Sequence, residues 1–400
     1  MSLLPVAEAL ARCLMLVSSL PAETVPLRQA AGRVMAAPAI ARRDQPPFDA
    51  SAMDGYAVAG QPGVGTVLTV IGEAGAGHAF AGSIGPGQAV RIFTGAPVPE
   101  GAGSVVIQEN TRREGDLVTI IDASSGTNIR ARGQDFRVGD DITPRRLRPV
   151  DLALLAAMNI AEVSVARRPV VAILATGDEL IMPGEDPRPD QIVASNGLAL
   201  AAMFEAEGAE AHVLPIARDT VPSLKAAFEL ARGADLIVTI GGASVGDHDL
   251  VGPVARELGM EAAFWKIALR PGKPLMAGRL QGAALIGLPG NPVSSIVCAT
   301  LFILPMIRAM QGLPDPAPRP LQATLAVDVE ETGPRAHYMR ARLARLDVQS
   351  NHGGGLPLIT PFTGQDSALL RLMTQADALL IRPVGDTSRK AGEIVDYLPL

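Results

Sequence analysis

The chain has 400 residues, of which 48% are hydrophobic and only 3% aromatic, with 41 Gly and 33 Pro. At roughly 150 residues per domain this length predicts several domains, and the scarcity of aromatic residues predicts cores of Val, Ile, Leu and Ala in buried parallel strands joined by tight turns. A net charge of −6 lacks the basic excess that a nucleic-acid backbone requires, so nucleic acid is not an expected partner.

The N-terminal segment predicts an amphipathic helix rather than a signal peptide. No basic stretch precedes its apolar run, and Glu8 and Arg12 interrupt that run. The apolar side chains share one helical face: Val6, Leu10, Cys13, Leu14 and Val17. The only other cysteine, Cys298, is distant in sequence, and neither has a CxxC partner or a zinc-binding Cys/His cluster. This cysteine usage is consistent with a reducing cytoplasm.

One stretch, residues 280–307, is apolar and uncharged enough to be considered as a membrane span. Gly287, Pro289, Gly290 and Pro292 divide it into a short strand and a helix. The apolar part after this division is shorter than the roughly 20 residues that a span needs. The sequence therefore predicts no membrane segment here.

From about residue 44 the helical period is lost, and short apolar runs alternate with Gly-rich turns. Strands are expected at Val67–Ile71 and Val105–Ile107, and a hairpin joins Arg112–Asp116 to Leu117–Ile121. Helical spacing returns over 137–166, with one face formed by Val150, Leu154, Leu155 and Met158. The segment 44–136 thus predicts a β domain inserted into a helical domain of residues 1–43 and 137–168.

Beyond residue 168 the chain repeats strand, Gly-rich loop and helix, which predicts a doubly wound α/β domain over 169–313. Continuous apolar strands precede ATGDEL, GGASVGDHD and PGNPVSS, and such strands lie in a sheet covered on both faces. A further strand, Phe264–Leu269, is expected before RPGKP. Helix signals are Ser195 with Gly208, and Pro222 with Gly233. After the Pro-rich linker LPDPAPRP, residues 314–400 predict a C-terminal β domain.

The Gly-rich loops should open onto one crevice, because open parallel sheets bind ligands at the carboxyl ends of their strands. Each loop also has a structural interpretation. Thr176 with Asp178 and Glu179 could simply cap a helix, and the GGASVGDHD, RPGKP and PGNPVSS loops could be plain turns or caps. Together they supply carboxylates for a metal beside cations and helix N-termini for phosphates, the arrangement of phosphoryl or nucleotidyl chemistry.

A serine hydrolase is the alternative class of enzyme. Gly242-Ala243-Ser244-Val245-Gly246 fits GxSxG and follows a predicted strand, as a nucleophile elbow does. The acids on either side of His248 would crowd an acyl site with negative charge. A histidine base would have to be His337 or His352, both in the C-terminal β domain.

The segment PPFDASAMDGYA (46–57) is followed along the chain by RIFTGAPVP, VVIQEN, RARGQD, ATGDEL, Ser195-Asn196, GGASVGDHD, RPGKP and GLPGNPVSS. In these segments and in their order the sequence resembles the MoeA-type molybdopterin molybdenumtransferases, related to the C-terminal domain of gephyrin. PPFDASAMDGYA is similar to the family signature. Departures are Arg270 where Lys is common, Ala50 where Asn is frequent, and Asp366 where Gly is frequent.

This resemblance implies a multidomain α/β fold with a C-terminal β-barrel, a cytoplasmic homodimer, and a cleft between the α/β domain of one subunit and the inserted β domain of the other. The implied reaction inserts molybdate into adenylylated molybdopterin and releases AMP with the help of Mg²⁺. Molybdopterin adenylyltransferase and molybdoenzyme apoproteins are the implied partners. Because gephyrin is also a scaffold, a non-enzymatic scaffold is a further alternative.

The resemblance also assigns roles to individual residues. The catalytic residues would be Asp54, Thr94, Asp135, Glu179 and Asp249. Mg²⁺ would be bound by Glu179 and Asp249. Molybdate or phosphate would be held by Arg270 and Lys273. The pterin pyrophosphate would be bound by Gly241, Gly242, Ser244, Gly246, Pro289, Asn291 and Ser294.

Overall fold

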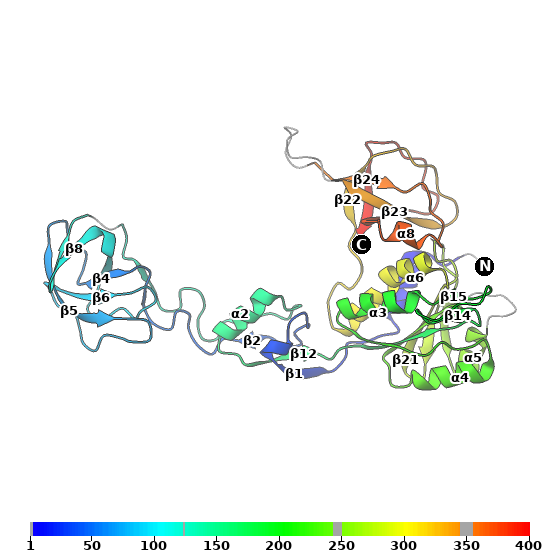
Figure 1. Ribbon diagram of the computed structural model, residues 1–400, viewed down its shortest axis with the longest axis horizontal. Coiled ribbons are helices and arrows are strands. Elements are labelled where there is room, and N and C mark those ends of the chain that lie inside the picture. Colours follow the sequence, from blue (N-terminus) through cyan, green and yellow to red (C-terminus); the bar gives the residue numbers. More distant parts are fainter. Residues whose placement is uncertain (1–2, 123–124, 243–249, 345–354) are drawn as a thin grey trace. The chain divides into compact units, whose positions relative to one another are not determined.

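The computed structural model of the protein describes residues 3–122, 125–242, 250–344 and 355–400. Two compact units make up the chain: Met1–Glu23 with Ala166–Leu400, and Thr24–Val165 (Figure 1). The first unit contains an α/β domain and a β-barrel. The second contains a β domain inserted into a smaller domain. The predicted multidomain α/β fold is confirmed.

A six-stranded sheet with the order β16-β13-β17-β21-β20-β18 forms the centre of the first unit. Its first four strands are parallel, whereas β20 and β18 are antiparallel to their neighbours. The strands are β13 (Val170–Ala175), β16 (Glu210–Val213), β17 (Leu236–Ile240), β18 (Glu261–Trp265), β20 (Met276–Leu280) and β21 (Ala283–Leu288). The order reverses between β13 and β17, so their carboxyl ends flank a topological switch point, where such sheets bind ligands.

Alternate residues of the central strands enter two separate cores. On β13, Val171 and Ile173 belong to one core, whereas Ala172 and Leu174 belong to the other. Figure 1 shows the helices that cover the two faces. The first core is covered by α3 (Asn196–Ala206), α6 (Pro292–Cys298) and α7 (Leu304–Met310), and the second by α4 (Val221–Leu230) and α5 (Val251–Glu257). The predicted doubly covered sheet is confirmed.

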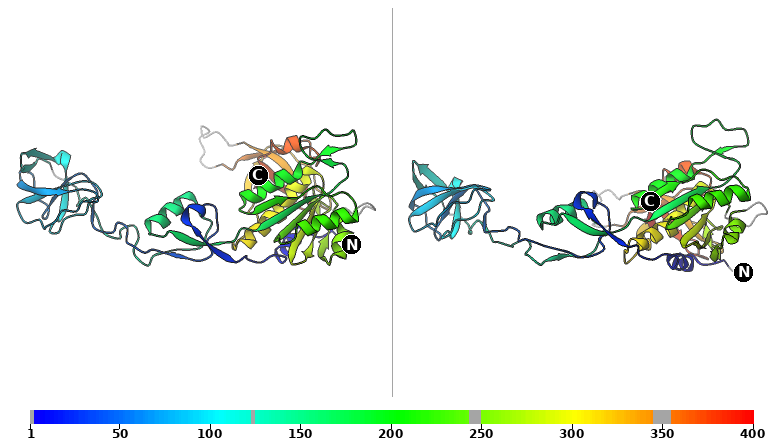
Figure 2. Two further views of the ribbon diagram at one scale, coloured as in Figure 1. Left: turned by 60° about the horizontal axis from the view of Figure 1, so that its bottom comes forward. Right: turned by 90° about the horizontal axis from the view of Figure 1, so that it is seen from below.

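The helix α1 (Val6–Leu14) packs against the first of these cores through the fully buried Ala9 and Cys13. Figure 2 shows it in dark blue beside the α/β domain. The predicted amphipathic helix is confirmed. Sequence analysis groups it with residues 137–168, but the structure places it in the α/β unit because the first core covers its apolar face.

The helical run Pro292–Met310 has 19 residues and is long and apolar enough to cross a membrane. The run continues through a π-helical turn, Ala299–Ile303, into α7, and at 19 residues it lies just below the roughly 20 residues used in the sequence prediction. Pro305 lacks the N–H that an α-helix would use at this point, which accounts for the irregular turn before it. In its most apolar stretch 72% is buried, so this is a core helix.

The predicted strand Phe264–Leu269 is wrong in its bounds. β18 ends at Trp265, and Lys266 has a φ of 64°, which ends regular pairing. The next strand, β19 (Leu269–Arg270), pairs instead with β23 of the C-terminal domain. The RPGKP loop therefore lies where the α/β domain meets the barrel.

Five strands of the C-terminal domain close into a barrel, as predicted. Their order is β23-β24-β22-β26-β25, and β25 pairs back onto β23. The interior is apolar and includes Leu325, Ala341, Ile359 and Leu380. The elements are β22 (Leu321–Leu325), β23 (Ala336–Ala344), β24 (Leu358–Pro361), α8 (Leu370–Met373), β25 (Ala378–Arg382) and β26 (Ile394–Pro399).

The β domain of the second unit is a six-stranded sheet with the order β7-β4-β6-β5-β9-β8. Separate cores cover its two faces. The predicted hairpin is confirmed as β8 and β9. The strands are β4 (Gly55–Val58), β5 (Val67–Ala74), β6 (Gln88–Ile92), β7 (Ser104–Ile107), β8 (Thr111–Glu114) and β9 (Leu117–Ile120).

The smaller domain of the second unit is less helical than predicted. Within its described residues the α-helix is α2 (Pro149–Ala157), and Arg137–Arg148 are not helical. The predicted helix face is partly wrong, because Leu155 and Met158 are buried but Val150 is 63% exposed. Paired short strands complete this unit: β1 (Ala22–Pro26) with β12 (Glu162–Ala166), β2 (Ala39–Ile40) with β11 (Asp141–Ile142), and β3 (Ala50–Ser51) with β10 (Ile129–Arg130).

Gly55 provides a test of how the second unit is held together. A Cβ at this position would overlap the carbonyl oxygen of Val106 on the neighbouring strand. Gly55→Ala should therefore destabilise this unit by about 1–3 kcal/mol or more. Gly63→Ala, where a Cβ meets nothing within 4 Å, is the matched control. Chemical unfolding followed by circular dichroism measures both, and equal stability of the two variants would contradict this account of strand packing.

Candidate functional site

The carboxyl ends of β13, β17 and β21 surround a cavity of about 530 Å³, here named the strand-end crevice. Three loops reach it: the first carries Thr176 and Glu179, the second Gly241 and Gly242, and the third Pro289 to Asn291. Its position at the topological switch point is the one that the strand order predicts. The crevice is therefore the candidate ligand site of the first unit.

Backbone fit explains the glycine that follows β17. Gly241 has a φ of 87°, and a Cβ there would lie 2.9 Å from the carbonyl oxygen of Thr176. The Thr176 N–H donates to the carbonyl of Ile240 at 3.0 Å. The buried Thr176 hydroxyl has no hydrogen-bond partner among the described residues, although it lines the crevice. Two strand ends thus meet too closely for any side chain at 241.

A polar network fixes the third loop against α3 and α6. Asn196 Nδ2 donates to the Gly290 carbonyl at 2.7 Å and to Ser295 Oγ at 3.3 Å. The buried Ser295 hydroxyl donates to the Pro289 carbonyl at 2.6 Å. Because buried polar groups require partners, this network specifies the loop conformation.

The C-terminal barrel also reaches the crevice. Asn291 Nδ2 donates to Ser367 Oγ at 2.9 Å, and Ala368 is a lining residue. Arg340, only 1% exposed, donates to the carbonyl oxygens of residues 364, 366 and 369 at 2.8–3.1 Å. A buried guanidinium thus holds the loop that carries Ser367.

Asp178, Glu179 and Asp219 lie near one another, and of these Glu179 lines the crevice. Arg218 donates to the carbonyls of residues 177, 178 and 180 and so holds the ATGDEL loop. The Asp219 N–H donates to Asp178 Oδ1 at 3.2 Å. Desolvation and the negative charges of Asp178 and Glu179 raise the pKa of the Asp219 carboxyl. No helix follows Glu179 directly, so the helix-capping interpretation of ATGDEL is wrong.

Sequence reasoning missed Arg218 and Asp219, because ARDT before a helix reads as an ordinary loop. Their proximity to ATGDEL arises from an isolated bridge between Thr176 and Ala217. A sequence signal for this pairing was absent. Asp219 is thus a third acidic side chain beside Asp178 and Glu179, the two that ATGDEL supplies.

The donor chemistry of these three acidic residues suits Mg²⁺, which prefers carboxylate oxygens. Burial raises the pKa of Asp219 most, and the charges of Asp178 and Glu179 add to this rise; a cation would offset the part due to these charges. Over the part of the chain that the structure describes, no group of three or more His, Cys, Asp or Glu side chains is arranged to hold a metal. Asp249, the other expected ligand beside Glu179, lies outside the described residues.

Several predicted ligand-binding residues line the strand-end crevice together: Glu179, Gly241, Gly242, Pro289 and Asn291. Ser294 is buried on α6 and is not a lining residue; Ser295 forms the contacts there instead. Ser244, Gly246 and Asp249 lie outside the described residues, as do His248 and His352. The proposed GxSxG nucleophile is therefore not placed.

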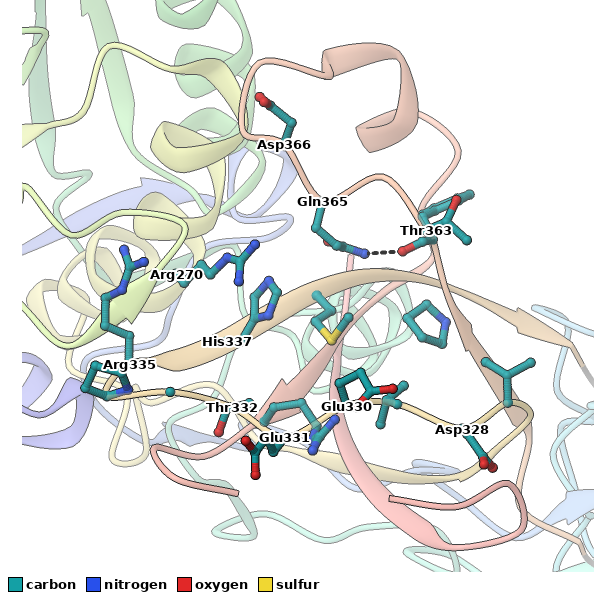
Figure 3. A pocket seen from close by; sticks show the side chains of 18 residues that line it. Arg270, Asp328, Glu330, Glu331, Thr332, Arg335, His337, Thr363, Gln365 and Asp366 are labelled. Carbon is teal, nitrogen blue, oxygen red and sulfur yellow. Dashed lines mark hydrogen bonds between the residues drawn. The ribbon is translucent and has the colours of Figure 1, made fainter. Parts of the chain in front are cut away.

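The two predicted cations have different surroundings. Lys273 is exposed and precedes Pro274, which lines the strand-end crevice. Arg270 lines another cavity, formed largely by the barrel and shown in Figure 3. The structure therefore does not assign both to the same cavity.

The remaining predicted catalytic residues belong to the second unit. Asp54 Oδ1 accepts hydrogen bonds from the Thr94 N–H and hydroxyl, both at 2.7 Å. These bonds, the backbone one first, lower the pKa of the Asp54 carboxyl. Asp135 lines a separate cavity of about 500 Å³ in the same unit, beside Gln134 and Arg130. Asp54 is therefore an ionised acceptor at neutral pH.

Fold and site together define a multidomain α/β protein with a ligand crevice at the switch point of a doubly wound sheet. Residues 4–159 match the family described as "MoeA N-terminal region (domain I and II)", 172–309 match "Probable molybdopterin binding domain", and 322–400 match "MoeA C-terminal region (domain IV)". The chain belongs to the MoeA family of molybdopterin molybdenumtransferases.

Relatives of known name support this assignment over nearly the full length. The chain is 35% identical to the molybdopterin molybdenumtransferase of Nostoc sp., covering 94% of this chain and 88% of that protein. It is 31% identical to that of Staphylococcus aureus (strain COL), covering 99% and 95%. A crystal structure of the molybdopterin biosynthesis protein MoeA from Pyrococcus horikoshii OT3 matches with a TM-score of 0.81, at 26% identity and full coverage of both chains.

Asp219→Asn tests the accumulation of charge around Asp219. The folded state raises the pKa of Asp219, so ionisation costs stability above that pKa, and this cost disappears as the pH falls below the unfolded value. In EDTA at pH 7 the variant should melt about 1–2 °C higher than the parent, because this exposed carboxylate is screened. The difference should shrink towards pH 4 and on addition of Mg²⁺.

Asp190→Asn is the control, since Arg188 lowers the pKa of Asp190 and removal of that charge should give no gain. Scanning calorimetry measures both variants. A lower melting temperature for Asp219→Asn than for the parent would contradict the charge account.

Proposed function

We propose that the protein transfers molybdenum from molybdate to adenylylated molybdopterin, with release of AMP and formation of molybdenum cofactor. The observation that carries this proposal is the strand-end crevice, which combines Gly and Asn residues after β17 and β21 with the carboxylate of Glu179 after β13. Close backbone approach suits a pyrophosphate, and the carboxylate suits a cation that offsets its charge. The family to which the chain belongs supports the same reaction, and a serine hydrolase or a purely structural scaffold is not favoured.

Each part of the site has a proposed role. Gly241, Gly242, Pro289 and Asn291 would bind the pyrophosphate, with Ser244, Gly246 and Ser294 nearby in sequence. Arg270 and Lys273 would hold molybdate or phosphate, Lys273 as a point charge. Glu179 and Asp249 would bind Mg²⁺, which would supply positive charge at the cleaved phosphate. Asp54, Thr94 and Asp135 would act from the second unit.

The chain's own residues fix the shape of the crevice and orient the groups that would meet the substrate. Asn196 donates to the Gly290 carbonyl and Ser295 to the Pro289 carbonyl, so both carbonyls have partners and the loop after β21 is fixed at the edge of the crevice. Asp54, ionised and oriented by Thr94, can accept a proton or a hydrogen bond from substrate. We further propose a cytoplasmic location, and molybdopterin adenylyltransferase and molybdoenzyme apoproteins as partners.

The reaction is tested by incubating the protein with adenylylated molybdopterin, molybdate and Mg²⁺ and measuring AMP. Glu179→Gln should lower the rate by more than about a hundred-fold, because it removes charge from the metal site. Glu205→Gln, an exposed change on α3, should leave the rate unchanged. EDTA should stop AMP release, and Mg²⁺ should restore it.

Ser244→Ala separates the transferase from a hydrolase. Loss of one hydrogen bond to a charged phosphate, about 1.5–3 kcal/mol, should reduce AMP release about ten- to a hundred-fold without abolishing it. A nucleophilic serine would instead react with a fluorophosphonate and require no metal. AMP release that ignores EDTA, together with labelling of Ser244, would end the transferase proposal.

We also propose a homodimer in which the second unit of one chain completes the crevice of the other. Sedimentation at micromolar concentration should give about twice the chain mass of 41.5 kDa. Mixing the inactive variants Glu179→Gln and Asp54→Asn should restore about a quarter of the parent activity, since half of the dimers would be mixed and carry one intact site of two. A monomer, or a dimer without restored activity, would contradict a shared cleft.

A further inference from the structure

The edge of the β domain that presents Asp54 and Thr94 also contains Arg91, a half-buried arginine near the end of β6. Asp54 directly precedes β4, and Thr94 lies two residues after the end of β6. These two strands pair antiparallel, with Tyr56 opposite Arg91, so Asp54 and Thr94 lie in loops at the same edge of the sheet. The proposed function gives roles to Asp54 and Thr94 but none to Arg91.

The guanidinium of Arg91 fixes the main chain at Asp54. Its Nη1 donates to the carbonyl of Gly55, the residue after Asp54, at 2.9 Å. Its Nη2 donates to Gln108 Oε1 at 2.6 Å. The N–H of Gln108 in turn donates to the Asp54 carbonyl at 3.0 Å. Two consecutive carbonyls, those of Asp54 and Gly55, are therefore held by one planar group, the first through Gln108 and the second directly.

The same guanidinium also contacts the residue before Thr94. Its Cζ lies 4.6 Å from the ring centroid of Phe93 and 5.3 Å from that of Tyr56. Tyr56 is only 5% exposed, so one of these rings is fixed in a core. Arginine can stack on a ring and donate directed hydrogen bonds at once, because its guanidinium is planar. Arg91 thus connects the neighbours of Asp54 with the neighbour of Thr94.

The contact between Asp54 and Thr94 depends on how their two loops are placed. Both side chains are exposed, so packing contributes little to their orientation. Asp54 Oδ1 accepts two hydrogen bonds from Thr94, each at 2.7 Å, and such bonds weaken steeply when their geometry changes. A catalytic group keeps a precise orientation only when surrounding residues hold it. Arg91 is the described side chain that contacts residues adjacent to both partners.

The electrostatics of the pair agree with this geometry. The backbone and side-chain hydrogen bonds from Thr94 lower the pKa of the Asp54 carboxyl most, and the charge of Arg91 lowers it further. Loss of Arg91 would remove its charge and loosen the bonds from Thr94. Both changes raise the pKa of Asp54, so the titration of this carboxyl reports on Arg91.

We propose that Arg91 is a positioning residue for the reaction, which holds Asp54 and Thr94 in the orientation that meets the substrate. It acts through its neighbours and does not itself touch the reacting atoms. This inference rests on the proposed function, which gives Asp54 and Thr94 their catalytic role. It predicts a loss of turnover rather than of substrate affinity. Lysine should not replace Arg91, because it keeps the charge but lacks the planar fork.

Steady-state AMP release by the full-length protein tests this role. Arg91→Gln and Arg91→Lys should each lower kcat about ten-fold with little change in KM, because a misplaced carboxylate affects the reacting geometry. Arg113→Gln is the matched control. Arg113 also donates to a main-chain carbonyl at 2.9 Å, that of Gly115, but lies in the β8–β9 hairpin, so this variant should keep the parent kcat. Melting temperatures close to that of the parent show that each variant is folded.

Two further measurements separate positioning from a merely structural role. In protein labelled with ¹³C at its aspartate carboxyls, the Asp54 signal, assigned with Asp54→Asn, should titrate at higher pH in both Arg91 variants but not in Arg113→Gln. In a Thr94→Val background, Arg91→Gln should lower kcat by less than about three-fold, because the pair that it positions is already weakened. An equal ten-fold loss in that background, parent-like activity of Arg91→Gln, or full activity of Arg91→Lys would overturn the proposal.

Phe93→Leu decides if Arg91→Gln does not fold, because Phe93 is only half-buried. It removes a ring beside the guanidinium, and should lower kcat about three-fold and raise the pH at which Asp54 titrates. Parent-like kcat and titration in Phe93→Leu would then overturn the proposal. Absence of AMP release from the parent would instead contradict the proposed function, and the Asp54 titration would still decide the role of Arg91.

Discussion

Burial of a parallel sheet on both faces is the constraint on which the first unit depends. Residues such as Ile173 and Leu174 enter opposite cores, so β13 has no face left for polar chemistry. Polar groups are confined to the strand ends, and parallel strands bring these ends to one edge. Packing of the two cores therefore places the crevice at the strand ends. Its polar residues lie in the loops and need no polar partners within the strands.

Contacts between the α/β domain and the C-terminal barrel also shape this edge of the sheet. The chain leaves the α/β sheet at Lys266, and the next strand, β19, joins the barrel. The Asn291–Ser367 hydrogen bond is a second attachment. Arg340 is buried but has its donors satisfied by carbonyls, so it contributes conformational specificity to one loop rather than a free charge. The barrel loop that carries Ser367 is therefore held in shape by Arg340. Its position is fixed by the hydrogen bond from Asn291, which directly precedes α6.

Sequence patterns located the α/β strands, helices α3 and α4, the C-terminal β domain and the Gly-rich loops of the crevice, because local apolar runs and Gly-rich loops encode them. The closure of that domain into a barrel and the five crevice residues were expected from the family resemblance. Sequence patterns did not locate Asp219, because its position beside ATGDEL depends on the isolated bridge between Thr176 and Ala217, which are distant in sequence. The predicted strand Phe264–Leu269 is wrong in its bounds because the positive φ of Lys266 ends the strand, and the pattern of apolar residues does not indicate this φ. The helix 137–148 failed because apolar spacing there serves short strand pairs and turns.

The burial of α1 against the Pro292–Met310 helix has a consequence for synthesis of the chain. Cys13 and Cys298 belong to the same core, although nearly the whole α/β domain separates them in sequence. A ribosome releases the amphipathic α1 long before the helix that covers it exists, and domains fold as their segments emerge. Until residue 310 has emerged, the apolar face of α1 is only partly covered, because α1 contacts both β18 and the later helix. This early segment is thus among the last to be fully packed, and a chaperone that binds exposed apolar helices would meet it during that interval.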